Sequence, residues 1–370
     1  MRFSYLHGGN IYKFAEELGI DERKIMDFSA SINPLGVSKN AMAEIQKHMK
    51  YLHNYPDPDA KRLRKYLAQS HGIDSETILC GNGSTELIYL IPRALKPKKV
   101  LIPAPTFSEY ERACRMANYK LQIGNYKLQI AKDFEINSDK FILTMRGDRD
   151  SELPTPNSTL PCNMAFLCNP NNPTGRLLKK DDALKIAETA KELKCYLIID
   201  EAFIDFCPEH SLINEVQNNP YLIVLRSMTK FYALSGLRIG YGVFPQHLIE
   251  ILKNYKEPWT VNSLAQMAAV IALKDRIYRD ETFRLMQVEK KSLEKGFKKL
   301  GLRFSPSDTN FYLLKIDNAQ EIYDRLKMKG ILVRDCSNFK GLDSRYIRVA
   351  VKSHRENTIL LRELTAIVQK

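Results

Sequence analysis

The middle of this 370-residue chain alternates short, wholly apolar segments with longer stretches of helical periodicity. The apolar segments predict strands at Thr77–Cys80, Val100–Ile102, Ala165–Cys168, Tyr196–Ile199, Leu222–Leu225 and Ile239–Val243. Amphipathic stretches between them, such as Thr85–Leu95 and Lys180–Leu193, predict helices. A strand that is apolar along its whole length needs cover on both faces, which is typical of a mostly parallel sheet with helices on each side. The fold class is therefore predicted to be α/β.

The pattern changes after Pro258, where a long charged helix is predicted at Asp275–Leu300. Strands are expected at Asn310–Ile316, Ile331–Arg334 and Tyr346–Val351, and a helix from His354 to the end. A chain of this length suits two domains. We expect a large domain at 50–260 and a smaller α+β domain that combines 1–49 with 261–370.

Composition excludes several classes of protein. The formal charge is +13, but the Lys and Arg residues are spread along the chain without a nucleic-acid-binding motif. No apolar run reaches the roughly 20 residues of a membrane span, and the N-terminus has no apolar signal segment. The seven cysteines form no C-x-x-C pair, and the histidines show no metal-ligand spacing. We expect a cytoplasmic protein without metal, membrane or nucleic acid.

Two segments have no functional interpretation. The hexapeptide at Asn118–Ile123 recurs at Asn125–Ile130, which is too short to define a repeat architecture. The polar, proline-containing segment Asp148–Pro161 is predicted to be a surface loop.

The chemistry-bearing residues follow the predicted strands. Lys230 lies just beyond a buried strand, where its amine can form an imine with an aldehyde cofactor. Ser227 and Arg238 offer a hydroxyl and a fork of donors for a phosphate. Asp200 ends another buried strand and could pair with a protonated pyridine nitrogen. Taken singly, these residues equally fit an exposed loop lysine and an acidic helix cap.

Residues that follow other predicted strands could also contact such a cofactor. Ser84 and Thr85 follow two glycines at the start of a predicted helix, where free N–H groups and the helix dipole favour an anion. Phe107 offers an aromatic face for a ring, and Asn172 offers an amide for a ring hydroxyl oxygen. Each of these positions, taken alone, is also explained by turn chemistry or core packing.

The order of these motifs resembles the pyridoxal 5′-phosphate (PLP) enzymes of aminotransferase class I/II, over nearly the whole chain. The resemblance implies PLP-dependent transferase fold type I (aspartate aminotransferase-like), with a mostly parallel seven-stranded sheet. It implies Lys230 and Asp200 as catalytic residues and a PLP site built from Ser84, Thr85, Phe107, Asn172, Asp200, Ser227, Lys230 and Arg238. Phe203 departs from the family pattern, because many members carry there a tyrosine that hydrogen-bonds the ring oxygen.

Asn54–Pro58 is similar to the family's Y-P-D-P element. In the family this tyrosine reaches the cofactor phosphate of the neighbouring subunit. The resemblance therefore implies a homodimer with shared active sites, in which Tyr55 contacts the partner's PLP. A packed tyrosine in a turn is the alternative.

The N-terminal His7–Asn10 and the segments Asp27–Gly36 and Pro103–Glu111 resemble the threonine-phosphate decarboxylase family. Its members decarboxylate an O-phospho-amino acid to aminopropanol phosphate for the cobalamin nucleotide loop. The resemblance places the substrate's anionic group at His7, Asn33, Asn172, Arg334 and Arg348. Arginine suits this role because its planar fork meets a phosphate bidentately.

Alternatives remain open at this point. Histidinol-phosphate aminotransferase shares the Y-P-D-P element and the PLP motifs, and a PLP-fold sensor or nucleic-acid binder is a non-enzymatic possibility. Phosphothreonine and phosphoserine differ by one methyl group, worth only about 1–3 kcal/mol in a pocket. The sequence also leaves open whether Lys230 or a water protonates Cα.

Overall fold

The larger part of the molecule is built on a seven-stranded sheet in the order β2-β8-β7-β6-β5-β3-β4. This computed structural model describes residues 7–118, 121–127, 133–147 and 161–368. Strand β8 runs antiparallel to both neighbours, and the other pairings are parallel. The strands are β2 Ile78–Asn82, β3 Lys99–Ala104, β4 Gln122–Lys127, β5 Met164–Cys168, β6 Tyr196–Asp200, β7 Leu222–Ser227 and β8 Ile239–Val243.

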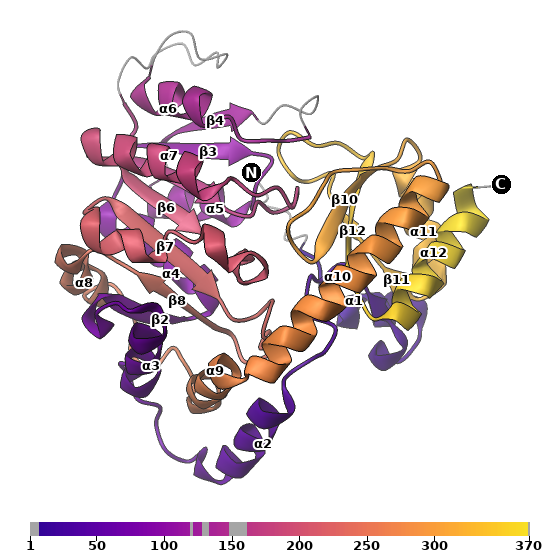
Figure 1. The fold of residues 1–370 in the computed structure, drawn as a ribbon, viewed down its shortest axis with the longest axis horizontal. Coiled ribbons are helices and arrows are strands. Elements are labelled where there is room, and N and C mark those ends of the chain that lie inside the picture. The colour runs from indigo at the N-terminus through magenta and orange to yellow at the C-terminus, as the bar shows by residue number, and fades with distance from the viewer. Residues whose placement is uncertain (1–6, 119–120, 128–132, 148–160, 369–370) are drawn as a thin grey trace.

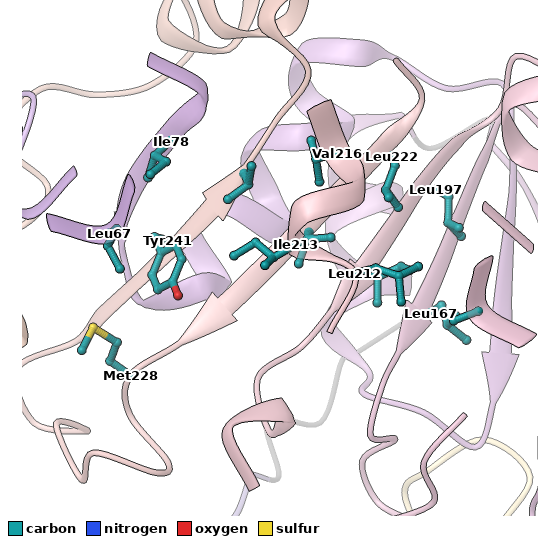
Figure 2. Packing of buried hydrophobic residues seen from close by; sticks show 14 of the residues in the cluster. Leu67, Ile78, Leu167, Leu197, Leu212, Ile213, Val216, Leu222, Met228 and Tyr241 are labelled. Carbon is teal, nitrogen blue, oxygen red and sulfur yellow. The ribbon is translucent and has the colours of Figure 1, made fainter. Parts of the chain in front are cut away.

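Successive apolar side chains of each strand enter different cores because side chains alternate across a sheet. In β5, Leu167 belongs to one core and Phe166 to the other. Figure 2 shows the first core, where Leu167, Leu197 and Leu222 from neighbouring strands lie along one face. This burial on both faces explains why a central strand such as β5 is apolar along its whole length.

Helices cover both faces of this sheet (Figure 1). Residues of α4, α5 and α8 share a core with one face, and residues of α3, α6, α7 and α9 share a core with the other. Their bounds are α3 Lys61–His71, α4 Gly83–Leu95, α5 Glu109–Ala117, α6 Ser138–Arg146, α7 Lys180–Glu192, α8 Gln246–Lys253 and α9 Ser263–Lys274. Within the described ranges, no helix combines the length and the apolar character that crossing a membrane requires.

A smaller antiparallel sheet in the order β12-β13-β10-β9 lies in the C-terminal third. A separate parallel pair joins β1 of the N-terminal segment to β11. Figure 1 shows α10, α11 and α12 gathered beside this sheet. The elements are α1 Ile11–Leu18, β1 Met26–Asp27, α2 Lys39–His48, α10 Arg276–Lys299, β9 Arg303–Phe304, β10 Phe311–Lys315, α11 Ala319–Met328, β11 Ile331–Leu332, β12 Arg334–Asp335, β13 Tyr346–Ala350 and α12 His354–Val368.

The predicted α/β fold is confirmed, with a mostly parallel seven-stranded sheet and a smaller antiparallel one. The single strand predicted at Ile331–Arg334 is wrong: it is two short strands, β11 and β12, that join different sheets. The predicted domain bounds stay a proposal with one change. Ala41 of α2 and Ala265 of α9 pack into the large sheet's core, so we assign these two helices to the large domain.

The seventh strand, β4, begins inside the first copy of the duplicated hexapeptide and extends into the second. Parts of both copies lie outside the described residues, as does nearly all of the predicted loop Asp148–Pro161.

Candidate active site

A cavity of about 400 Å³ lies at the carboxyl ends of β5, β6 and β7. Ligands of open α/β sheets bind in this position. The cavity brings together residues predicted from very different parts of the sequence. Those lining it are His7, Ser84, Thr85, Phe107, Asn172, Asp200, Ser227, Lys230, Arg238, Arg334 and Arg348.

Asp200 ends β6 and is only 3% exposed. Its carboxylate accepts hydrogen bonds from the hydroxyl of Tyr110 at 2.7 Å and from the N–H of Ala202 at 3.0 Å. Burial raises the pKa of Asp200 to about 6, and these two hydrogen bonds oppose the rise. The group is therefore an anion at neutral pH, fixed in place and able to pair with a ring N–H.

Sequence reasoning missed Tyr110, because a tyrosine three residues after Phe107 is readily interpreted as a core residue. It stacks on Phe166 with ring centroids 5.0 Å apart and meets the edge of Phe107 at 5.6 Å. The phenol is thus held by packing on two sides, which directs its hydroxyl to Asp200.

Lys230 lies in the loop after β7 and lines the same cavity. Burial first, and then the nearby Arg348 and Arg238, lower the pKa of its ammonium to about 8, while Asp200 opposes them. A lysine with a lowered pKa releases its proton more easily, as an amine nucleophile requires. Its ammonium lies 6.0 Å from the ring centroid of Phe203, the position where the family often has tyrosine.

The first turn of α4 forms one wall of the cavity through Ser84 and Thr85. The N-cap residue Asn82 makes no side-chain capping bond. The N–H of Gly83 donates to the carbonyl of Arg238 at 3.0 Å, so the N–H groups that follow it in the first turn are the ones that can face an anion. Gly240 of β8 allows the start of α4 to pack closely against this strand, because a Cβ there would lie 2.3 Å from the backbone nitrogen of Ser84. Arg238 completes the group with its guanidinium.

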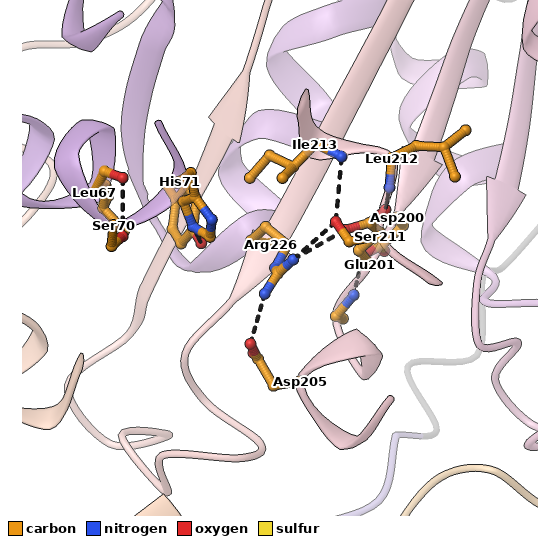
Figure 3. A network of polar contacts seen from close by, with 12 residues as sticks. Leu67, Ser70, His71, Asp200, Glu201, Asp205, Ser211, Leu212, Ile213 and Arg226 are labelled. Atoms are coloured by element: carbon orange, nitrogen blue, oxygen red, sulfur yellow. Dashed lines mark hydrogen bonds and ion pairs between the residues drawn. The ribbon is translucent and has the colours of Figure 1, made fainter. Parts of the chain in front are cut away.

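A buried ion-pair network supports the strand ends (Figure 3). Arg226 of β7 binds Glu201 at 3.0 Å and Asp205 at 2.5 Å, and Ser211 donates to Glu201 at 2.6 Å. Arg226 and Glu201 adjoin Ser227 and Asp200 in the chain. The network therefore fixes the two strand ends that present those side chains to the cavity.

Arg334 and Arg348 are direct partners in the antiparallel pairing of β12 with β13. Directly opposite residues in such a pair project from the same face. Each is 7% exposed. Burial, and then the neighbouring Arg334, lowers the pKa of Arg348 to about 10. Like charges placed opposite each other are destabilising, so this arrangement prepares a site for an anion.

The two guanidinium groups are oriented by their neighbours. Arg348 donates to the backbone carbonyl of Ser29 at 2.8 Å and to the amide oxygen of Asn172. Arg334 donates to the carbonyl of Asp335 at 2.6 Å and to the side chain of Asn338 at 2.8 Å. Because Arg348 engages the oxygen of Asn172, the amide NH₂ is left to donate to a bound ring.

Two predicted site residues lie elsewhere. The prediction that Asn33 covers the substrate is wrong: its amide donates to the carbonyl of Phe231 at 2.8 Å and to Thr282 at 2.7 Å, and it does not line the cavity. Tyr55 is 84% exposed and contacts Trp259, with ring centroids 5.4 Å apart. It does not line the cavity.

The fold is the α/β fold of aminotransferase type, and the cavity combines the half-buried Lys230, the buried Asp200 and the N-terminal turn of α4. The family model described as aminotransferase class I and II matches residues 23–364. The chain therefore belongs to this family.

Named relatives divide between two activities. Threonine-phosphate decarboxylase of Salmonella typhimurium is 37% identical over 370 residues, covering 99% of this chain and 97% of that protein. The crystal structure of histidinol-phosphate aminotransferase from Clostridium acetobutylicum aligns with a TM-score of 0.83 at 31% identity, covering 93% of this chain and 99% of that one. That of L-threonine-O-3-phosphate decarboxylase from Porphyromonas gingivalis aligns with a TM-score of 0.80 at 28% identity, covering 94% and 100%.

Proposed function

We propose that this chain is a PLP-dependent decarboxylase of an O-phospho-L-amino acid, with O-phospho-L-threonine as the preferred substrate. The observation that carries the proposal is the pair of buried arginines, Arg334 and Arg348, that face each other across two strands and line the cavity of Lys230. Similarity to threonine-phosphate decarboxylase over nearly the whole chain supports it.

The residues of the cavity fit PLP. Ser84, Thr85, Ser227 and Arg238 would hold its phosphate, since they combine a helix start, hydroxyls and a guanidinium. The carboxylate of Asp200 would accept a hydrogen bond from the ring N–H. Phe107 would lie against the ring, and the amide NH₂ of Asn172 would donate to the ring oxygen.

When bound, PLP supplies an electron sink for the pair released from the Cα bond that stands perpendicular to its ring. Arg334 and Arg348 decide which bond that is. If both arginines hold the substrate's phosphate, neither clamps the carboxylate in the plane of the ring. The carboxylate can then turn out of the plane and leave as CO₂. Asp200 contributes by remaining ionised, which keeps a proton on the ring nitrogen.

Histidinol-phosphate aminotransferase is the second candidate, favoured by the 31% identity to the clostridial enzyme of that name. Its substrate also carries a phosphate, so the same arginines would bind it. The two functions differ in the bond broken at Cα, and they require different co-substrates.

The deciding experiment incubates the PLP-loaded enzyme with O-phospho-L-threonine in the absence of any keto acid. We expect CO₂ and aminopropanol phosphate in equal amounts, and O-phospho-L-serine tested in parallel ranks the two substrates. Turnover only when histidinol phosphate and 2-oxoglutarate are supplied would establish the aminotransferase instead.

A variant tests the role of the arginines. Arg348→Gln removes charge-assisted hydrogen bonds worth about 1.5–3 kcal/mol, so KM for the phospho-amino acid should rise roughly 10- to 150-fold. Arg345→Gln is the matched control, because Arg345 is half exposed and pairs only locally with Asp343. Equal KM values for the two variants would show that Arg348 does not bind the substrate.

We also propose a homodimer in which Tyr55 enters the partner's active site. Tyr55 is 84% exposed, and the half-exposed Trp259 beside it extends an apolar surface that water would otherwise cover. Light scattering on the PLP-loaded protein tests the assembly. A monomer with full activity would refute it.

A further inference from the structure

A histidine–carboxylate contact lies in the lining of the cavity that also contains Arg334 and Arg348. The Nε2 atom of His7 lies 3.0 Å from Oε1 of Glu109, and both residues line the cavity. Glu109 begins α5 of the large domain and is 6% exposed, whereas His7 belongs to the N-terminal segment and is half exposed. The contact thus ties that segment to the large domain beside the substrate.

Glu109 is itself held rigidly. The hydroxyl of Tyr89 donates to its Oε2, and Arg112 approaches the same oxygen at 3.2 Å. Burial alone would raise the pKa of Glu109, but the hydrogen bonds from His7 and Tyr89 outweigh it and bring the pKa to about 2. Glu109 is therefore a fixed anion facing a cavity that receives anions, and this needs an explanation.

The backbone that carries His7 is fixed on its other side. The N–H of Gly9 donates to the hydroxyl of Ser29 at 2.7 Å, and a Cβ on Gly8 would lie 2.4 Å from the carbonyl oxygen of Ser29. Arg348 donates to that same oxygen at 2.8 Å. Ser29 therefore links the position of the His7 backbone to that of the substrate arginine.

We propose that Glu109 is a positioning residue that holds the imidazole of His7 so that its second ring nitrogen donates to the substrate's phosphate, beside Arg334 and Arg348. Only a doubly protonated imidazole donates from both nitrogens, so the proposed arrangement requires that form of His7 in the substrate complex. Glu109 acts on the anionic substrate only through His7, which separates the two negative charges. The inference rests on the proposed function in one respect, namely that the substrate carries a phosphate.

The test is a double-mutant cycle on the PLP-loaded enzyme with Glu109→Gln, His7→Gln and the double variant. Each single variant should raise KM for O-phospho-L-threonine about tenfold, equal to one lost charge-assisted hydrogen bond, and leave kcat within about twofold. The double variant should be no weaker than His7→Gln, because Glu109 has no separate contact with the phosphate. Glu111→Gln is the control from the same helical turn, since Glu111 pairs with Arg115 and does not line the cavity.

Inorganic phosphate as a competing ligand makes the outcome independent of the reaction. Its inhibition constant, or its dissociation constant by calorimetry if the enzyme does not turn over O-phospho-L-threonine, should rise in the same pattern across the variants. Additive losses in the double variant, or a lower kcat with weaker PLP binding in Glu109→Gln, would show a purely structural role and overturn the inference. Failure of the wild type to decarboxylate O-phospho-L-threonine would refute the proposed function, while the phosphate measurement would still decide the role of Glu109.

Discussion

Replacing Lys230 with methionine should stabilise the cofactor-free protein, although it removes the proposed catalytic amine. Burial lowers the pKa of Lys230 from the ordinary value of 10.5 to about 8. The unfolded chain therefore binds this proton more tightly than the folded chain does. A lysine of this kind destabilises the fold fully below pH 8, and the destabilisation fades as the pH rises towards 10.5.

The magnitude follows from the same two pKa values. With 1.36 kcal/mol for each pKa unit, the charged lysine costs about 3.3 kcal/mol of folding free energy at pH 7 and about 1.4 kcal/mol at pH 9.5. Methionine has a similar length and no charge, so Lys230→Met should be more stable than wild type by up to about 3 kcal/mol at pH 7. The gain should shrink to about two fifths of that value by pH 9.5.

The assay is urea unfolding of the cofactor-free proteins at equal concentration, at pH 7 and at pH 9.5. Comparison of variant with wild type cancels the other groups that titrate in this range. Lys298→Met is the control, because Lys298 is exposed on α10 and its replacement should have the same small effect at both pH values. A gain for Lys230→Met that does not shrink between the two pH values would refute the reasoning, as would a loss of stability at pH 7.

Two further variants test the supports of the site. Tyr110→Phe removes a hydrogen bond that lowers the pKa of Asp200, so that pKa should rise above about 6. The acid limb of the plot of kcat/KM against pH should then move to higher pH. An acid limb at the same pH as in the wild type would contradict this role of Tyr110. Gly240→Ala places a Cβ against the backbone of Ser84 and should weaken PLP binding and destabilise the fold by about 1–3 kcal/mol, measured by cofactor titration and thermal unfolding. Gly236→Ala is its control, since a Cβ there meets nothing within 4 Å, and equal effects of the two would contradict the steric argument.

The strand-end residues could be predicted because the carboxyl ends of parallel strands meet at one edge of a sheet. Asp200 and Ser227 each lie just beyond an apolar run, Tyr196–Ile199 and Leu222–Leu225, so the sequence already indicated that they lie at the same edge. The ends of the predicted strands shifted by only a few residues, because polar residues such as Asn82 extend the ladder beyond the apolar run.

What the sequence could not give is the direction of each side chain. Asn33 is close in the chain to Ser31, which lines the cavity. Its amide nevertheless donates to the carbonyl of Phe231 and to Thr282 of α10. The local sequence around Glu109 and Tyr110 indicates only the start of a helix. The roles of these two residues depend on partners that are distant in the sequence, such as Asp200 for Tyr110. Local patterns do not encode such long-range contacts.

The charges around the cavity explain why one site serves both coenzyme and substrate. Arg348 lowers the pKa of Lys230, and Arg334, opposite Arg348 on the neighbouring strand, lowers the pKa of Arg348. These cations repel one another, and the carboxylates of Asp200 and Asp27 offset only part of that repulsion at Lys230. A phosphorylated ligand reduces that repulsion when it binds. The repulsion between the cations in the ligand-free cavity therefore increases the affinity of the cavity for anions. The gain expected for Lys230→Met therefore has two origins, first the burial of the lysine and then its repulsion by Arg348 and Arg238.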